Sequence, residues 1–406
     1  MELGPRCGGS ERHHPDVPTQ RAALGDAVDD PLGGHELRHG LLEGRQWPDL
    51  QATYGPNPIT LPVASVCEPR DLRSEYLSEV LVLGQVGEDP LGGLGELVLD
   101  DYMVRAHEHS LLGSGWIMLP VSEIEQWWTE GRLIQLPLGG HERTVFTRSM
   151  GSGPQLTLLH GFPSSSHDWA KAAKLLAQSR RLLLVDFLGF GASEKPADHD
   201  YSLHEQADLV EAVWAREGVT ATRLVAHDYG VSVAQELLAR RADGRLAVEL
   251  ESLHLLNGGL YPKLHRPQPL QTALLDPEQG PRISALVSEE LFIAGLGPTF
   301  AEGFDAMADS ADIWRATSRN GGERISHLLI RYIRDREEHG ARWTGALERT
   351  DVPLGFVWGM LDPVSGAHMA ERIRERLPDA QFVALEDVAH WPPLEAPERV
   401  VAALLA

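Results

Sequence analysis

Residues 223–230 read RLVAHDYG and predict a β-strand, a sharp turn and the start of a helix. Apolar residues lead into the turn, Asp228 stands at its centre, and the helix-like segment VSVAQELLARR follows. So tight a turn needs small residues two positions before and two positions after its exposed residue, because a larger side chain there would collide with the neighbouring backbone. Ala226 and Gly230 meet that requirement. The stretch therefore presents one acidic side chain between a strand and a helix.

Two interpretations of Asp228 are open on this stretch alone. In the first, the turn holds Asp228 as a reactive group at the end of a strand, as a nucleophile elbow does with serine. In the second, the Asp228 side chain accepts a hydrogen bond from the first turn of the helix and acts as an N-cap. The remainder of the chain decides between them.

The composition of the chain excludes several classes of partner. Its 406 residues carry a formal net charge of −23, whereas binding to nucleic acid or an anionic membrane needs clustered lysine and arginine. No run approaches the ~18 apolar residues that span a bilayer, and the N-terminus lacks the basic-then-apolar layout of a signal peptide. We therefore expect a cytoplasmic protein that has no transmembrane segment and binds no nucleic acid.

Neither a metal site nor a cofactor site is expected. The two cysteines, Cys7 and Cys67, lie near the N-terminus, so no disulfide framework and no cysteine-ligated metal are predicted. The pair His13-His14 has no carboxylate cluster at ligand spacing, and we interpret it as part of a solvated loop.

The character of the chain changes near residue 120. Residues 1–119 keep no helical or strand period for long, and we interpret them as a poorly patterned N-terminal extension, either disordered or a gene-model artefact. Strands then alternate with helices, which predicts 120–259 as the first part of an α/β core. Only helices are predicted over 260–345, as in a cap over the carboxyl end of a sheet. The core resumes over 346–406.

The alternation of strands and helices predicts the fold class. Apolar runs such as QLTLLH and RRLLLVD have the character of buried strands, and a helix-like segment follows each of them. Gly139-Gly140, between two further strand-like runs, indicates a β-hairpin. Right-handed crossovers would join the other strands into a mostly parallel, eight-stranded sheet with helices on both faces and an inserted helical cap.

Three polar residues follow predicted strands at the edge where open α/β sheets bind their ligands. Asp228 follows the fifth strand, Asp362 the seventh and His390 the eighth. Each alone has a structural explanation, since loop histidines are often solvated and Asp362 precedes a proline, as in many turns. Together they arrive in the order nucleophile, acid, histidine, which is the order that α/β-hydrolases use.

Six segments taken together resemble the epoxide hydrolase and haloalkane dehalogenase branch of the α/β-hydrolases. They read HGFPSSSHDW, VDFLGFGASEKP, AHDYG, NGGLYPKLHRP, WGMLDPV and DVAHWPPLEAP. The set is most similar to the mesoderm-specific transcript protein family, and the resemblance covers about 124–406. It implies an α/β-hydrolase fold with a helical cap and hydrolysis through a covalent ester.

The residues themselves suit this chemistry. Asp228 would attack a saturated carbon and become an alkyl ester, and water activated by His390 would then attack the carbonyl carbon of that ester. Asp362 would fix the imidazole tautomer and stabilise its cationic form. The backbone amides of Phe162 and Tyr229 would form the oxyanion hole. The expected partners are a small apolar electrophile and water.

The leaving group separates an epoxide from an alkyl halide. An epoxide opens to an alkoxide that needs a proton donor, which cap tyrosines supply in the branch that the chain resembles, and Tyr332 and Tyr261 are the candidates. Tyr332 also has an ordinary interpretation as a core aromatic of a helix. Haloalkane dehalogenases usually place tryptophan directly after the nucleophile, where this chain has Tyr229, so an epoxide hydrolase is favoured. Trp314 and Trp343 keep a haloalkane dehalogenase open as the alternative.

Two further alternatives come from other classes of protein. A serine-type ester hydrolase would use Ser232, which also lies among small residues in GVSVA but falls about one turn into the predicted helix. A non-catalytic protein could keep the hydrolase fold and bind a ligand without turnover. The sequence carries no signal of the oligomeric state.

Overall fold

The structure, a computed structural model, describes residues 51–54, 57–60, 80–83, 103–106, 115–118 and 122–406. The chain divides into two compact units, Met1–Leu119 and Pro120–Ala406. In the first unit the described residues form one antiparallel pair and one antiparallel triplet of short strands: β1 (Gln51–Tyr54) with β2 (Asn57–Thr60), and β3 (Val80–Leu83) with β4 (Met103–Ala106) and β5 (Gly115–Met118). The cysteines and the pair His13-His14 lie outside the described residues.

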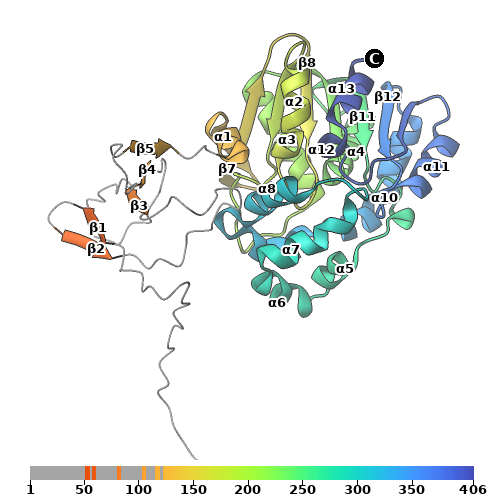
Figure 1. Cartoon of the computed structure of the whole chain (residues 1–406). Coiled ribbons are helices and arrows are strands. Elements are labelled where there is room, and N and C mark those ends of the chain that lie inside the picture. The colour runs from red at the N-terminus through yellow and green to blue at the C-terminus, as the bar shows by residue number, and fades with distance from the viewer. Residues whose placement is uncertain (1–50, 55–56, 61–79, 84–102, 107–114, 119–121) are drawn as a thin grey trace, which may run out of the picture. The chain divides into compact units, whose positions relative to one another are not determined.

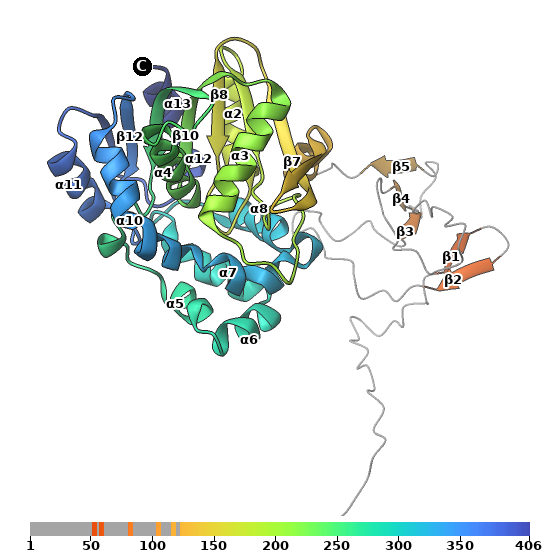
Figure 2. The same cartoon turned by 180° about the vertical axis from the view of Figure 1, so that it is seen from behind.

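The second unit is built on one eight-stranded sheet (Figures 1 and 2). In chain order its strands are β6 (Arg132–Leu138), β7 (His141–Met150), β8 (Gln155–Leu159), β9 (Arg181–Val185), β10 (Ala221–His227), β11 (Glu249–Leu256), β12 (Leu354–Gly359) and β13 (Gln381–Leu385). Their spatial order is β13-β12-β11-β10-β8-β9-β7-β6, and neighbours are parallel except that β7 is antiparallel to β9 and β6. The predicted α/β-hydrolase fold is confirmed, as is the hairpin at Gly139-Gly140.

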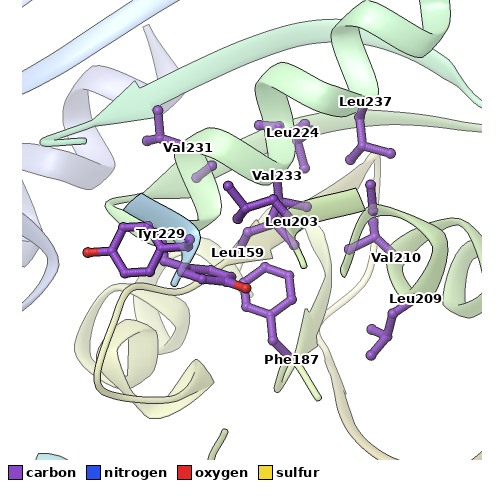
Figure 3. Close-up of a cluster of buried hydrophobic side chains, with 14 of the residues drawn as sticks. Leu159, Phe187, Leu203, Leu209, Val210, Leu224, Tyr229, Val231, Val233 and Leu237 are labelled. Atoms are coloured by element: carbon purple, nitrogen blue, oxygen red, sulfur yellow. The ribbon is translucent and has the colours of Figure 1, made fainter. Parts of the chain in front are cut away.

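Helices cover both faces of this sheet (Figures 1 and 2). They are α1 (Glu123–Thr129), α2 (Ala170–Leu176), α3 (Leu203–Glu217), α4 (Tyr229–Ala242), α11 (Ala367–Arg376), α12 (Pro392–Glu395) and α13 (Pro397–Leu405). Side chains alternate between the two faces along a strand. In β10, Leu224 and Ala226 pack in a cluster with α3 and α4, part of which Figure 3 shows, whereas Val225 packs with residues of α2 and α13.

The chain between β11 and β12 is helical, as predicted. Its α-helices are α5 (Pro269–Leu275), α6 (Gln279–Leu286), α7 (Glu289–Leu296), α8 (Met307–Ser318), α9 (Ser326–Leu329) and α10 (Tyr332–Arg349). In Figures 1 and 2, α5, α6, α7 and α8 gather across one end of the sheet, whereas α10 packs beside α4. The predicted boundary at residue 345 falls inside α10. None of the helices that the structure describes is long and apolar enough to cross a membrane.

The turn between β10 and α4 is as tight as the sequence predicts. Asp228 has φ 44° and ψ −103°, a backbone conformation that residues with a side chain rarely adopt. A Cβ atom on Gly230 would lie 2.8 Å from the carbonyl oxygen of His160, so only glycine fits there without a shift. The side chain of Asp228 makes no capping hydrogen bond to α4. The interpretation of Asp228 as a side-chain N-cap is therefore wrong.

Replacing Gly230 with alanine is expected to lower the free energy of unfolding by about 1–3 kcal/mol, because the added Cβ atom overpacks the turn. Gly297→Ala is the matched control, since a Cβ atom there meets nothing within 4 Å and its φ of −46° suits alanine. Urea unfolding followed by circular dichroism measures both variants. Equal stabilities would contradict the packing argument.

Candidate active site

Asp228, Asp362 and His390 meet at the carboxyl edge of the sheet. They follow β10, β12 and β13, which run parallel although they are far apart in the sequence. Nδ1 of His390 lies 2.9 Å from Oδ2 of Asp362, and Nε2 of the same ring lies 3.9 Å from Oδ2 of Asp228. All three residues are buried. The structure thus places one imidazole between two carboxylates.

The carboxylate of Asp228 is also bound by the backbone. The N–H of Phe162, in the loop after β8, donates a 3.0 Å hydrogen bond to Oδ2 of Asp228. The N–H of Tyr229 is the first in α4, and the first N–H groups of a helix have no partner within it. Of the two predicted oxyanion donors, the N–H of Phe162 therefore contacts the carboxylate of Asp228 directly, and the N–H of Tyr229 belongs to the next residue in the chain.

The loop that carries Phe162 is fixed by His160. Nε2 of His160 accepts a 3.1 Å hydrogen bond from the N–H of Phe187, which leaves Nδ1 to donate to the carbonyl oxygen of Gly161 at 2.8 Å. The ring is fully buried, and its pKa is lowered, mainly by burial. His160 is thus a neutral structural residue, and it holds the amide of Phe162 in place.

Asp362 is held by residues that were assigned no role from the sequence. Its Oδ2 accepts hydrogen bonds from Nδ2 of Asn257 at 2.9 Å and from Oγ of Ser365 at 2.8 Å. Its Oδ1 accepts a 2.7 Å bond from the N–H of Val364. Asn257 follows β11 at the same edge of the sheet, and that position was the only signal of its role.

Burial and charge act in opposite directions on these ionisable groups. Burial opposes ionisation of Asp228, but the charges of His390 and then Arg336 hold its pKa below the ordinary value. For His390, burial is outweighed by the charge and hydrogen bond of Asp362, which raise the pKa to about 9. Burial of Asp362 is likewise outweighed by His390, and its pKa is lowered. At neutral pH the imidazole is therefore a cation between two carboxylates.

The two candidate tyrosines lie in different surroundings. Tyr332, at the start of α10, is buried, and its ring packs against Tyr229 and Phe162 at 5.1 and 5.6 Å between centroids. Burial, together with the charge of Asp228, raises the pKa of Tyr332. The hydroxyl of Tyr261 instead donates to Glu348 at 3.3 Å. The structure therefore brings Tyr332 toward the site and turns Tyr261 away from it.

A mostly apolar cavity opens beside His390. Phe162, His390 and Trp391 line it from the core, and most of the remaining lining comes from α5, α6, α7, α9 and the turns next to them, with Leu274, Val287 and Leu296 among the residues. Gln271 also lines it and donates a 3.4 Å hydrogen bond to the hydroxyl of Tyr332. Within the part of the chain that the structure describes, no group of three or more His, Cys, Asp or Glu is arranged to hold a metal ion.

Arg336, a buried cation beside Asp228, was not expected from the sequence. Nη2 of Arg336 lies 3.7 Å from Oδ1 of Asp228 and donates to the backbone carbonyl of the same residue at 3.2 Å. Its Nε donates to Oγ of Ser232 at 2.7 Å. Arg336 lies four residues after Tyr332, and residues at that spacing share one face of a helix. That spacing was the available signal.

Comparison with known proteins agrees with the fold. The model of the family described as alpha/beta hydrolase fold matches residues 154–397. The LipZ protein of Mycobacterium tuberculosis is 40% identical over 285 residues, which cover 70% of this chain and 97% of that protein. The human mesoderm-specific transcript homolog protein is 40% identical over 259 residues, which cover 61% of this chain and 76% of that protein. The resemblance carried by the six sequence segments is confirmed.

A solved structure has the same fold. The haloalkane dehalogenase DbeA of Bradyrhizobium elkani matches with a TM-score of 0.56 at 23% identity, over 68% of this chain and 96% of that chain. The family model, for its part, spans more than half of the chain. The chain belongs to the alpha/beta hydrolase fold family.

Proposed function

We propose that this hydrolase opens epoxides through an aspartate nucleophile and a covalent alkyl-enzyme ester, without a cofactor. One observation carries the proposal: the carboxylate of Asp228 lies at a strained turn, bonded to the amide of Phe162 and 3.9 Å from the imidazole of His390. A nucleophile, an oxyanion donor and a base are thus within reach of one reacting carbon.

In the first step, a carboxylate oxygen of Asp228 attacks an epoxide carbon, and the bond from that carbon to the ring oxygen breaks. The electron pair goes to the ring oxygen, which takes the proton of the Tyr332 hydroxyl. Esterification removes the charge of Asp228, one of the causes that raise the pKa of Tyr332. The phenol therefore becomes a better proton donor as the ester forms.

In the second step, Nε2 of His390 takes a proton from water, and the resulting hydroxide attacks the carbonyl carbon of the Asp228 ester. The oxyanion accepts hydrogen bonds from the amides of Phe162 and Tyr229. Collapse breaks the bond to the alkyl oxygen, which takes the proton back from His390, and the diol leaves. Asp362 stabilises the imidazolium. Before this step the imidazolium of the resting site gives its proton to the Tyr332 phenolate that the first step left, and loss of the Asp228 charge favours that transfer. After the step, the proton that the attacking water leaves on the Asp228 carboxyl returns to His390, so both carboxylates, the phenol and the imidazolium are restored.

The substrate that suits this site is small and apolar. The cavity beside His390 is lined mainly by aliphatic and aromatic side chains of the inserted helices, which we propose act as a cap. Few polar groups face it, so a substrate rich in hydroxyl groups or charge would lose its hydration without replacement.

Conversion of Tyr332 to phenylalanine is expected to lower kcat on epoxides about 10²-fold, because the departing alkoxide loses its proton donor. Tyr261→Phe is the matched variant for the second tyrosine and should retain activity, since its hydroxyl donates to Glu348. Diol formation measured by chromatography compares the two. Full activity of Tyr332→Phe together with loss in Tyr261→Phe would reverse the assignment.

The alternatives differ in testable ways. A haloalkane dehalogenase needs N–H donors for the halide, but the indole N–H of Trp343 donates to Glu236 at 2.8 Å and the ring of Trp314 packs against Phe292. A serine hydrolase needs a free hydroxyl, whereas Oγ of Ser232 is buried and bonded to Arg336. A panel of epoxides, chloroalkanes and carboxylic esters tests all three activities. No turnover of any of them would support the non-catalytic binding protein.

A further inference from the structure

Arg336 of α10 is a buried cation that the mechanism above does not use. Only 1% of its surface is exposed. Its three nitrogens lie in different surroundings: Nε donates to Ser232, Nη2 donates to the backbone of Asp228, and Nη1 has no hydrogen-bond partner among the described residues. Its guanidinium also lies over the ring of Tyr332, 4.4 Å from the centroid.

Such an arrangement is costly for a purely structural arginine. A buried charge is tolerated when it is paired and its hydrogen bonds are satisfied, and Nη1 is not satisfied. The chain also makes room for this nitrogen, because a Cβ atom on Gly259 would lie 2.6 Å from Nη1. The surrounding residues therefore hold the guanidinium next to Asp228, although they leave one of its nitrogens without a hydrogen bond.

Arg336 distinguishes the two oxygens of Asp228. Oδ2 accepts the bond from Phe162 and faces His390, whereas Oδ1 lies 3.7 Å from Nη2 of Arg336. An oxygen already bound to an oxyanion donor is the one that remains as the carbonyl oxygen of the ester. The attacking oxygen is then Oδ1, the one beside the cation.

We propose that Arg336 is a positioning residue that keeps Asp228 ionised and orients Oδ1 for attack. This role rests on the proposed function of Asp228. Arg336 also favours the second step. Esterification neutralises Asp228 and leaves the buried guanidinium without a counter-charge, and hydrolysis of the ester restores that counter-charge.

The charged and titratable groups around Arg336 and Asp228 define the expected pH dependence of ester formation. His390, Arg336 and His227 face Asp228. Burial alone would raise the pKa of Asp228, but the charges of His390 and Arg336, with the hydrogen bond from the N–H of Phe162, hold it below its ordinary value. Tyr332 and the half-buried His265 also face the guanidinium. Burial lowers the pKa of His227 to about 4 and that of His265 to about 3, so both are neutral at neutral pH. Removing the charge of Arg336 therefore raises the pKa of Asp228.

The test is the pH profile of ester formation in the full-length protein. Enzyme is mixed with an excess of an epoxide that it turns over, and the reaction is quenched with acid. The alkylated fraction is measured by intact-mass spectrometry for reactions between pH 3 and 9. In Arg336→Met and Arg336→Gln, the acid limb of the alkylation rate is expected to move up by about 1–3 pH units. Arg336→Lys keeps the charge and should restore the limb, while its lost hydrogen bonds still lower the plateau rate.

Ser232→Ala is the matched control, because it removes the acceptor of Nε but keeps the cation, and its acid limb should coincide with that of the wild type. Thermal unfolding reports whether each variant is folded. If Arg336→Met does not fold, Arg336→Gln alone provides the neutral variant for the test. Acid limbs of both neutral variants that coincide with the wild type would overturn the proposal and leave Arg336 a structural residue. Absence of any ester in the wild type would instead remove the proposed function, and this role with it.

Discussion

Replacing Asp228 with alanine is expected to abolish epoxide turnover, with a fall in kcat/KM of about 10⁴-fold or more. The reason is chemical: without the carboxylate there is no group at the turn that can form the ester, and neither His390 nor the amide of Phe162 can substitute for it. Steady-state diol formation measures the effect, and circular dichroism checks the fold.

Ser232→Ala separates this outcome from the serine-type alternative. Ser232 lies in the first turns of α4, and its Oγ is an acceptor for Arg336. If the protein were a serine esterase, Ser232→Ala would abolish ester hydrolysis and Asp228→Ala would leave it largely intact. Epoxide turnover at the wild-type rate in Asp228→Ala would contradict the proposed nucleophile.

Replacing His390 with glutamine is expected to stop the reaction halfway. Ester formation needs only Asp228 and a proton donor, whereas ester hydrolysis needs the base, so kcat should fall by about 10²–10⁴-fold while one equivalent of epoxide is still consumed. Intact-mass spectrometry should show the protein heavier by the mass of the epoxide, with the adduct on the peptide that contains Asp228.

Asp228→Ala treated in the same way is the control and should carry no adduct. A His390→Gln protein that turns over slowly with no detectable adduct would contradict a two-step route, because the intermediate ought to accumulate when only its hydrolysis is impaired. Alkylation of another residue in both variants would indicate nonspecific reaction with the epoxide.

The local pattern of the sequence predicted the turn and the sheet well. Gly230 follows Asp228 at two residues because the carbonyl oxygen of His160 lies where a Cβ atom would need space, and a steric demand of this kind is visible in a few adjacent residues. The apolar strands and the order Asp228, Asp362, His390 are likewise properties of short segments. The N-cap interpretation failed because the Asp228 side chain bonds to the loop after β8 rather than to α4.

What the sequence could not provide were contacts across long separations. Arg336 reaches Asp228 from a helix 108 residues downstream, and Asn257 reaches Asp362 across 105 residues. No local period encodes either contact, since each depends on how α10 packs beside α4 and on which strands are neighbours. The same packing separates Tyr332 from Tyr261, which the sequence left as equal candidates.

The most direct test of the account is oxygen labelling in a single turnover. Excess enzyme is reacted with epoxide in water enriched in oxygen-18, then digested with trypsin in ordinary water, which releases LVAHDYGVSVAQELLAR with Asp228 inside it. Attack of water on the Asp228 ester predicts oxygen-18 in this peptide, with no oxygen-18 in the diol, whose new hydroxyl oxygen comes from the carboxylate. Oxygen-18 in the diol of the first turnover, together with an unlabelled peptide, would contradict the covalent route.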